Sequence, residues 1–254
     1  MQPAERNVTI KMKLLMFAVC FLVNGCTNQS DLTEQIENPV ESLYGTALNS
    51  VLNGDPKAAA PAFEEVERQH PYSELAIRAQ IMAAWSFYQD SNYLRANASL
   101  DRFIELNPTD PLIEYAYYLR ALCYYEQIVD VERDAEMSRL ALSAFEELVR
   151  RFPNGPHARD GKLKIDLISS HLAAKEMAVG RFYLKSEYYT AAIRRFKIVT
   201  KDYNTTNQVP EALYRLAEAY LAMGLVNEAN RFYEVAAYNY SNSIWTSRLK
   251  TLLV

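Results

Sequence analysis

Small and aromatic residues recur along the chain at a fixed spacing, with polar residues between them. A small residue is followed three positions later by an aromatic or polar residue, twelve positions later by an alanine, and four beyond that by an aromatic residue or leucine. This spacing predicts pairs of antiparallel helices, in which the small residues let the two helices approach closely and the aromatic residues fill the space between them. The first two occurrences are Ala47, Ser50, Ala59, Phe63, Val66 and Pro71, then Ala84, Phe87, Ala96, Leu100, Phe103 and Pro108.

Three further occurrences complete the array, and together they form the tetratricopeptide pattern. The sequence therefore predicts an all-α protein, a tetratricopeptide-repeat superhelix of about five helix-turn-helix repeats. The stretch SIWTSRLKTLLV (243–254) predicts a helix that caps the last repeat. The three later occurrences are Ala121, Tyr124, Ala141, Phe145, Leu148 and Pro153; Gly180, Tyr183, Ala192, Phe196 and Val199; and Ala217, Tyr220, Ala229, Tyr233 and Ala236.

Two intervals are longer than this period allows. In the third repeat about eight residues are inserted around QIVDVERDAE (127–136), and this acidic insertion is either a functional loop or solvated surface. Between the third and fourth repeats about 14 residues are added, close to four helical turns. No proline occurs from His157 to Phe182, which predicts one long helix running into the fourth repeat. The array would then divide into repeats one to three (40–156) and a second part (157–254).

The N-terminal segment KLLMFAVCFLVNGC (13–26) has a different pattern. Its apolar run is about ten residues long and follows basic residues, whereas crossing a bilayer takes roughly 20. This order is typical of a secretory signal. The end of the run, with Val23, Gly25 and Cys26, resembles the lipobox of bacterial lipoproteins, in which the cysteine receives the lipid.

We therefore expect a lipoprotein signal peptide over residues 1–25, lipidation at Cys26 and a flexible polar tether over residues 26–39. An ordinary signal peptide with a chance cysteine is the alternative, and Met12 is a second candidate for the start of the chain. With Cys26 assigned to the anchor, Cys123 has no partner for an internal disulfide once the signal is removed.

Composition and charge narrow the range of functions. The formal net charge is −4, and removing residues 1–25 takes away more basic than acidic residues. Without a basic tract we expect no nucleic-acid binding. The chain has seven glycines, three widely spaced histidines and no recognisable catalytic or phosphate-binding motif. We expect no enzyme, no catalytic residues, no metal and no cofactor.

Binding is the activity that stacked helix pairs support, because they expose a concave surface lined by the first helices. We expect the residues near each small residue, about one helical turn to either side, to point towards this concave surface. Most are aromatic with one polar end, which suits a groove for an extended peptide. The candidate groove consists of Tyr44, Leu48, Trp85, Tyr88, Tyr115, Tyr118 and Tyr125. The alternative is that these side chains pack against neighbouring helices.

Two segments, DRFIELNPTDPLIEYAYYLRAL (101–122) and FEELVRRFPNGPHARD (145–160), together with the lipobox and the five repeats, resemble the BamD family. The resemblance runs from about Leu43 to the end of the fifth repeat. It implies a lipid-anchored scaffold of the β-barrel assembly (BAM) machinery, on the periplasmic face of the cell outer membrane. Such a scaffold docks on BamA and assists the folding and insertion of outer-membrane β-barrel proteins.

The same resemblance implies BamA and unfolded outer-membrane protein precursors as partners, with the membrane reached through the lipid anchor, and it leaves room for other BAM lipoproteins. An alternative function is a tetratricopeptide lipoprotein of another envelope machine, serving pilus assembly, DNA uptake or peptidoglycan maintenance. Capture of BamA or of pilus or cell-wall proteins would separate the two.

In the BamD family, the C-terminal repeats bind the last POTRA domain of BamA, and an arginine on the second helix of the fourth repeat pairs with an acidic residue there. By the alignment through Ala192 and Phe196, the resemblance assigns this role to Arg195. The helical pattern places Arg195 exposed at the edge of the buried stripe. The neighbouring Arg194 is the second candidate, and a solvated arginine without a partner is the alternative.

Overall fold

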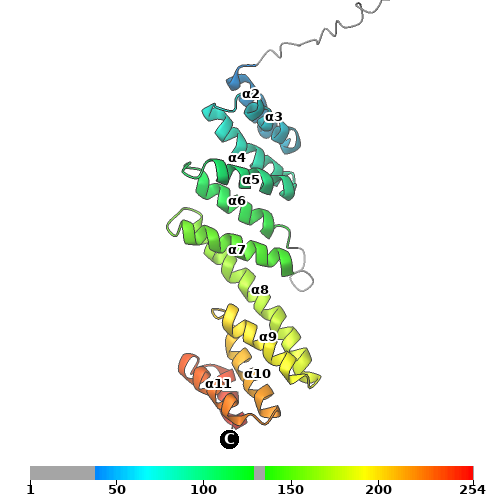
Figure 1. The fold of residues 1–254 in the computed structure, drawn as a ribbon, viewed down its shortest axis with the longest axis vertical. Helices are drawn as coiled ribbons and strands as arrows, with labels where there is room; N and C mark the ends of the chain where they lie inside the picture. Colours follow the sequence, from blue (N-terminus) through cyan, green and yellow to red (C-terminus); the bar gives the residue numbers. More distant parts are fainter. Residues whose placement is uncertain (1–37, 129–134, 254) are drawn as a thin grey trace, which may run out of the picture. The chain divides into compact units, whose positions relative to one another are not determined.

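The computed structural model describes residues 38–128 and 135–253, which form eleven α-helices and no strand within those ranges (Figure 1). The predicted all-α fold is therefore confirmed. None of the described helices combines the length and hydropathy needed to cross a membrane. The helices are α2 Val40–Leu52, α3 Pro56–Gln69, α4 Glu74–Gln89, α5 Tyr93–Leu106, α6 Ile113–Tyr125, α7 Ala135–Arg151, α8 Ala158–Lys185, α9 Tyr189–Asp202, α10 Val209–Ala222, α11 Val226–Asn239 and α12 Ile244–Leu253.

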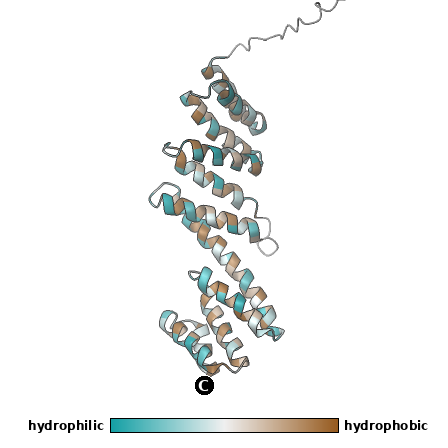
Figure 2. Cartoon of the chain, in the orientation of Figure 1, coloured by the Kyte–Doolittle hydropathy of each residue, from teal (hydrophilic) through white to brown (hydrophobic). Residues whose placement is uncertain are grey.

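The helices pack in the predicted pairs, α2 with α3 through to α10 with α11, and α12 packs on the last pair as the expected cap. Figure 2 shows that most helices carry both hydrophilic and hydrophobic positions, as helices with one buried face do. The small residues of the first helices and the large residues of the second helices meet in the core with essentially no exposure. They include Ala47, Ala84, Ala121 and Ala217 on one side and Phe63, Phe103, Phe145 and Phe196 on the other.

The predicted long helix is confirmed as α8, which has 28 residues. Its N-terminal part, up to the midpoint of the helix, contributes Ile168 and Leu172 to a core cluster with α6 and α7. Its C-terminal half contributes Ala173 and Met177 to the core of α9 to α12. One helix therefore belongs to both parts of the array, and the division of the array at this helix stays a prediction.

Helices in equivalent positions are spaced differently on the two sides of the array. First helices contact one another from one repeat to the next, α2 with α4, α4 with α6 and α8 with α10. Among the described residues, the second helices α3 and α5 make no comparable contact. We call the surface of α2, α4 and α6 that carries the predicted aromatic residues, together with the adjoining start of α8, the first-helix face. The surface of α3, α5 and α7 is the second-helix face.

The close approach of α8 and α9 predicts a specific effect on stability. A Cβ atom at Gly180 would lie 2.4 Å from Cε1 of Phe196, whose ring is fully buried. We expect Gly180→Ala to lower the free energy of unfolding by about 1–3 kcal/mol, because overpacking a core typically costs this much. Urea unfolding measures the change.

Gly45→Ala is the matched control for this variant. Gly45 also lies inside a helix, but nothing is within 4 Å of its Cβ position. Alanine has the higher helix propensity, so this variant should gain roughly 0.5–1 kcal/mol. Equal stabilities for the two variants would contradict the tight packing of Gly180.

Candidate protein-binding surfaces

Tyr118 lies at the junction between the third repeat and the start of α8. Its hydroxyl donates a hydrogen bond to Oδ2 of Asp160 at 2.9 Å, and its ring stacks on His157 with centroids 4.4 Å apart. Burial, and then the bond to Asp160, raises the pKa of the Tyr118 phenol above its ordinary value. The ring of Tyr115 also packs against His157, with the ring centroids 5.7 Å apart. Both rings remain partly exposed, so they belong to the surface while being held in place.

Tyr88 and Tyr125 extend this cluster along the first-helix face. The Tyr88 hydroxyl donates to Oε1 of Glu126 at 3.4 Å, and burial followed by the charge of Glu126 raises the pKa of Tyr88 to about 12. The ring of Tyr125 has Nζ of Lys164 4.6 Å from its centroid. Among the described residues, the hydroxyls of Tyr88 and Tyr118 therefore already have local hydrogen-bond partners.

Trp85 differs from the tyrosines because its indole N–H has no partner among the described residues. The side chain is half-buried and borders a hollow of about 240 Å³ beside the turn between α2 and α3, with Val51 and Pro56 on the other side. Of the remaining predicted groove residues, Tyr44 packs edge-on against Phe63 at 5.4 Å, and Leu48 is 36% exposed.

A second hollow of similar size, about 240 Å³, opens where α6, α7 and α8 meet. Tyr125, Ile128 and Leu167 give it largely apolar walls, and His171 lies at its edge. Ser138 also lines it, and its hydroxyl is fully buried without a hydrogen-bond partner in the described structure. The pattern of repeats predicted Tyr125 but gave no signal for Ser138, which precedes the repeat motif of α7.

The two predicted docking arginines have different environments on α9. Arg195 donates through Nη1 to Oε2 of Glu176 on α8 at 3.0 Å, with 40% of its side chain exposed. Glu176 itself is 9% exposed. Arg194 is exposed and has no ion-pair partner among the described residues. Arg195, at the edge of the buried stripe, is therefore partly exposed and anchored by a buried carboxylate, whereas Arg194 is the freer cation. The docking role of both arginines stays a prediction.

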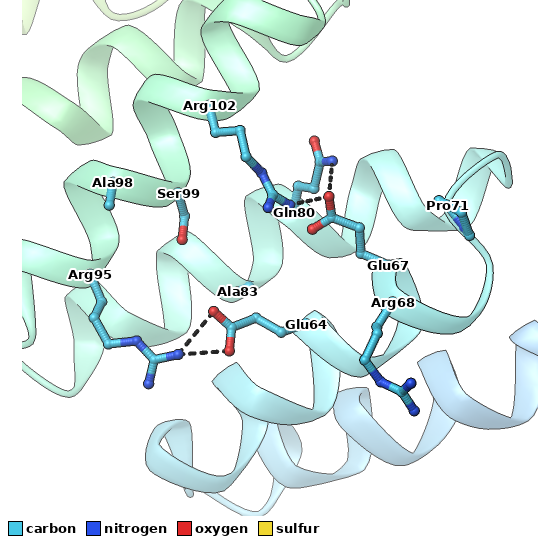
Figure 3. Close-up of a pocket in the computed structure, with 10 residues that line it drawn as sticks. All are labelled: Glu64, Glu67, Arg68, Pro71, Gln80, Ala83, Arg95, Ala98, Ser99 and Arg102. Carbon is cyan, nitrogen blue, oxygen red and sulfur yellow. Dashed lines mark hydrogen bonds and ion pairs between the residues drawn. The ribbon is translucent and has the colours of Figure 1, made fainter. Parts of the chain in front are cut away.

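A third surface was not predicted. A hollow of about 720 Å³ lies on the second-helix face between α3 and α5, above α4 (Figure 3). Figure 3 shows Arg95 and Arg102 reaching from α5 towards Glu64 and Glu67 on α3. The available signal was Ala83, a small residue where the next repeat has Arg120, one period of 37 residues later.

Several predictions fall on residues that the structure does not describe. The signal peptide, Cys26 and most of the tether lie outside the described residues, as does the middle of the acidic insertion, residues 129–134. Within the described ranges, no group of three or more histidine, cysteine or acidic residues is arranged to hold a metal ion. Cys123 is buried and forms no disulfide with any residue that the structure describes.

Repeated helix pairs with this register and an aromatic first-helix face define a tetratricopeptide-repeat scaffold. The chain matches the YfiO family, described as outer membrane lipoprotein, over residues 36–235. Outer membrane protein assembly factor BamD of Caulobacter vibrioides is 45% identical over 225 residues, 88% of this chain and 74% of that one. The BamD proteins of Rickettsia prowazekii (40%; 93% and 94% covered) and Neisseria gonorrhoeae (32%; 83% and 84% covered) are also similar.

The chain therefore belongs to the YfiO/BamD family of outer membrane lipoproteins, as the sequence resemblance indicated. Family membership associates it with the outer membrane and its assembly machinery. The role of an assembly factor is also non-enzymatic. The lipid anchor, the binding of BamA and the precursor groove stay predictions.

Proposed function

We propose that this protein is the lipid-anchored scaffold subunit of the β-barrel assembly machinery, holding BamA through its C-terminal repeats and outer-membrane precursors on its first-helix face. The observation that carries the binding role is Trp85, which lines an open hollow and whose indole N–H has no partner in the described part of the chain. The fixed tyrosines around Tyr118 are further along the same series of first helices. Membership of the BamD family supports the assembly role.

An extended precursor strand is the occupant that suits this face. Alternate side chains of a strand point to opposite sides, so one set would enter hollows such as those beside Trp85 and Tyr125, each about 240 Å³. The indole N–H of Trp85, which has no partner among the described residues, is a group to which a peptide backbone or polar side chain would add a hydrogen bond. The tyrosines held by Asp160 and Glu126 would need little reorganisation to bind it.

The docking role rests on α9. Arg195 is oriented by Glu176 through a single nitrogen, so its other N–H donors remain directed away from that bond. A guanidinium has five such donors and matches a carboxylate bidentately. An acidic residue on the last POTRA domain of BamA would pair with Arg195, while the exposed Arg194 would add attraction at the rim.

The groove is tested with a peptide of about ten alternating apolar and polar residues, the length of one barrel strand. We expect Trp85→Ala to weaken its binding about tenfold, because losing a central aromatic contact commonly costs more than 1 kcal/mol. Fluorescence anisotropy measures the affinity. Tyr118→Phe should change it less, since the ring stays and only the bond to Asp160 is lost.

Trp245→Ala provides the matched control, since it removes the same side chain from α12, next to Tyr214, away from the proposed groove. Its affinity for the peptide should stay at the wild-type value. Urea unfolding of each variant accompanies the titration. Trp85→Ala could instead lower the free energy of unfolding by roughly 3–5 kcal/mol while its folded fraction binds the peptide with wild-type affinity. Trp85 would then contribute to packing and not to peptide binding.

Docking is tested by capturing BamA from solubilised membranes with the full-length protein. We expect Arg195→Gln to reduce BamA capture at least tenfold and Arg194→Gln to reduce it less, because a rim charge contributes under about 1 kcal/mol. Glutamine retains an N–H donor for Glu176, which limits damage to the fold, and urea unfolding verifies this. If stable Arg195→Gln protein captured as much BamA as the wild type, the proposed ion pair between Arg195 and BamA would be excluded.

Anchoring is tested separately with Cys26→Ser, which removes the only thiol of the lipobox. Each buried methylene of an acyl chain contributes about 0.8 kcal/mol, so several chains hold a protein on the membrane stably. We expect the serine variant to leave the outer-membrane fraction or to accumulate as precursor, as followed by fractionation and mass spectrometry. Cys20→Ser is the control and should be lipidated normally. Unchanged lipid content in Cys26→Ser would overturn the assignment.

A further inference from the structure

Two successive grooves of the second-helix face are built on the same repeat register but are filled differently. Between α5 and α7 the groove is occupied by Arg120 of α6. Its guanidinium donates to Asp101 on α5 at 3.0 Å and to Glu147 on α7 at 2.7 Å, and it lies 4.9 Å from the centroid of the Tyr117 ring. Only 16% of the Arg120 side chain is exposed, so this groove is closed by the chain itself.

The preceding groove, between α3 and α5, lacks such a filling. One period of 37 residues earlier, Gln80 and Ala83 stand in the positions of Tyr117 and Arg120. Because both side chains are shorter, a hollow of about 720 Å³ remains open above α4 (Figure 3). This volume is in the range of ligand-binding sites.

The charged groups along the open groove are not used symmetrically. Arg95 donates to both oxygens of Glu64 through Nη2 alone, at 2.7 and 3.0 Å. Arg102 likewise bonds Glu67 through Nη2 alone, and Glu67 also accepts from Gln80 at 2.7 Å. Both oxygens of Glu64 and Oε1 of Glu67 therefore accept hydrogen bonds, whereas Oε2 of Glu67 and the Nε and Nη1 groups of each arginine have no partner among the described residues.

The exposed fractions of these side chains agree with the pattern of hydrogen bonds. The side chains of Arg95 and Arg102 are 52% and 55% exposed, whereas those of their partners Glu64 and Glu67 are 40% and 21% exposed. The two arginines are seven residues apart on α5, two helical turns or roughly 10.5 Å. Arg68, whose Nη1 is also unused, adds a third cation at the α3 side. The arginine N–H groups without a partner outnumber the one free carboxylate oxygen, so the unused hydrogen-bonding capacity of the groove is mainly for anions.

We propose that this groove is a docking site for an acidic polypeptide segment of a partner protein. Two carboxylates of the segment bind the unused donors of Arg95 and Arg102, and its backbone lies over Ala83 and Ser99, where small side chains leave room. The segment takes the place that Arg120 fills in the next repeat. The site is on the second-helix face and is independent of the precursor groove and of α9.

The test uses the full-length protein in detergent and a labelled peptide of alternating glutamate and alanine, ten residues long, with fluorescence anisotropy as the readout. We expect Arg95→Gln and Arg102→Gln each to weaken binding several-fold. Arg150→Gln, the same charge change on exposed α7, should leave it unchanged. A matched peptide of lysine and alanine should not bind.

Ala83→Arg is the decisive variant because it reproduces the filling of the next groove while adding a positive charge. Occlusion predicts about tenfold weaker binding, whereas diffuse surface attraction predicts tighter binding. Ser99→Arg, on the partly exposed side of α5, fills the groove without touching the core if Ala83→Arg does not fold. The proposal would be overturned if folded Ala83→Arg or Ser99→Arg bound the peptide more tightly, or if the wild-type protein showed no measurable binding. Displacement of the peptide by anionic lipid vesicles through the same arginines would also overturn it.

Discussion

The close approach of the two helices within each repeat is the constraint on which the other features of this structure depend. It is enforced by one small residue per repeat, and Gly180 shows how little space is left, since its missing Cβ would lie 2.4 Å from Phe196. A helix that packs this closely on its partner turns the side chains on one flank away from the interface. In this chain those flanking positions carry Trp85 and Tyr118, so the packing rule also creates the aromatic first-helix face.

The same rule has the opposite consequence for the second helices. Because α2, α4 and α6 contact one another directly, the helices behind them are farther apart, and each gap must be filled by side chains or left open. Tyr117 and Arg120 fill one gap and leave the guanidinium mostly buried. Ala83 leaves the other open. Ala83 is only 2% exposed and belongs to the core cluster, so it forms the floor of this gap, and a larger side chain there would extend from the core into the gap.

The repeat spacing is sufficient to predict the helix pairs, because each depends on residues close together in sequence. It also predicts α8, where length and the lack of proline leave one helix as the simplest solution. Contacts between different repeats were not predicted. The stack of Tyr118 on His157 depends on the rotation between α6 and α8, which is set by the volumes of all the side chains between them. The spacing of one repeat contains no information on that rotation.

The ion pair between Arg195 and Glu176 was not predicted, although the alignment of the repeats contains a signal for it. Glu176 precedes Gly180 by four residues, as Gln80 precedes Ala84, and this position faces the neighbouring second helix. At Arg195, as at Arg95, a carboxylate on an adjacent helix holds the guanidinium through one nitrogen only. Ordering a long side chain on binding costs about 0.5–1.5 kcal/mol. An arginine already held in this way has lost part of that freedom on folding, so it presents its remaining donors at a lower cost than an arginine free in solvent.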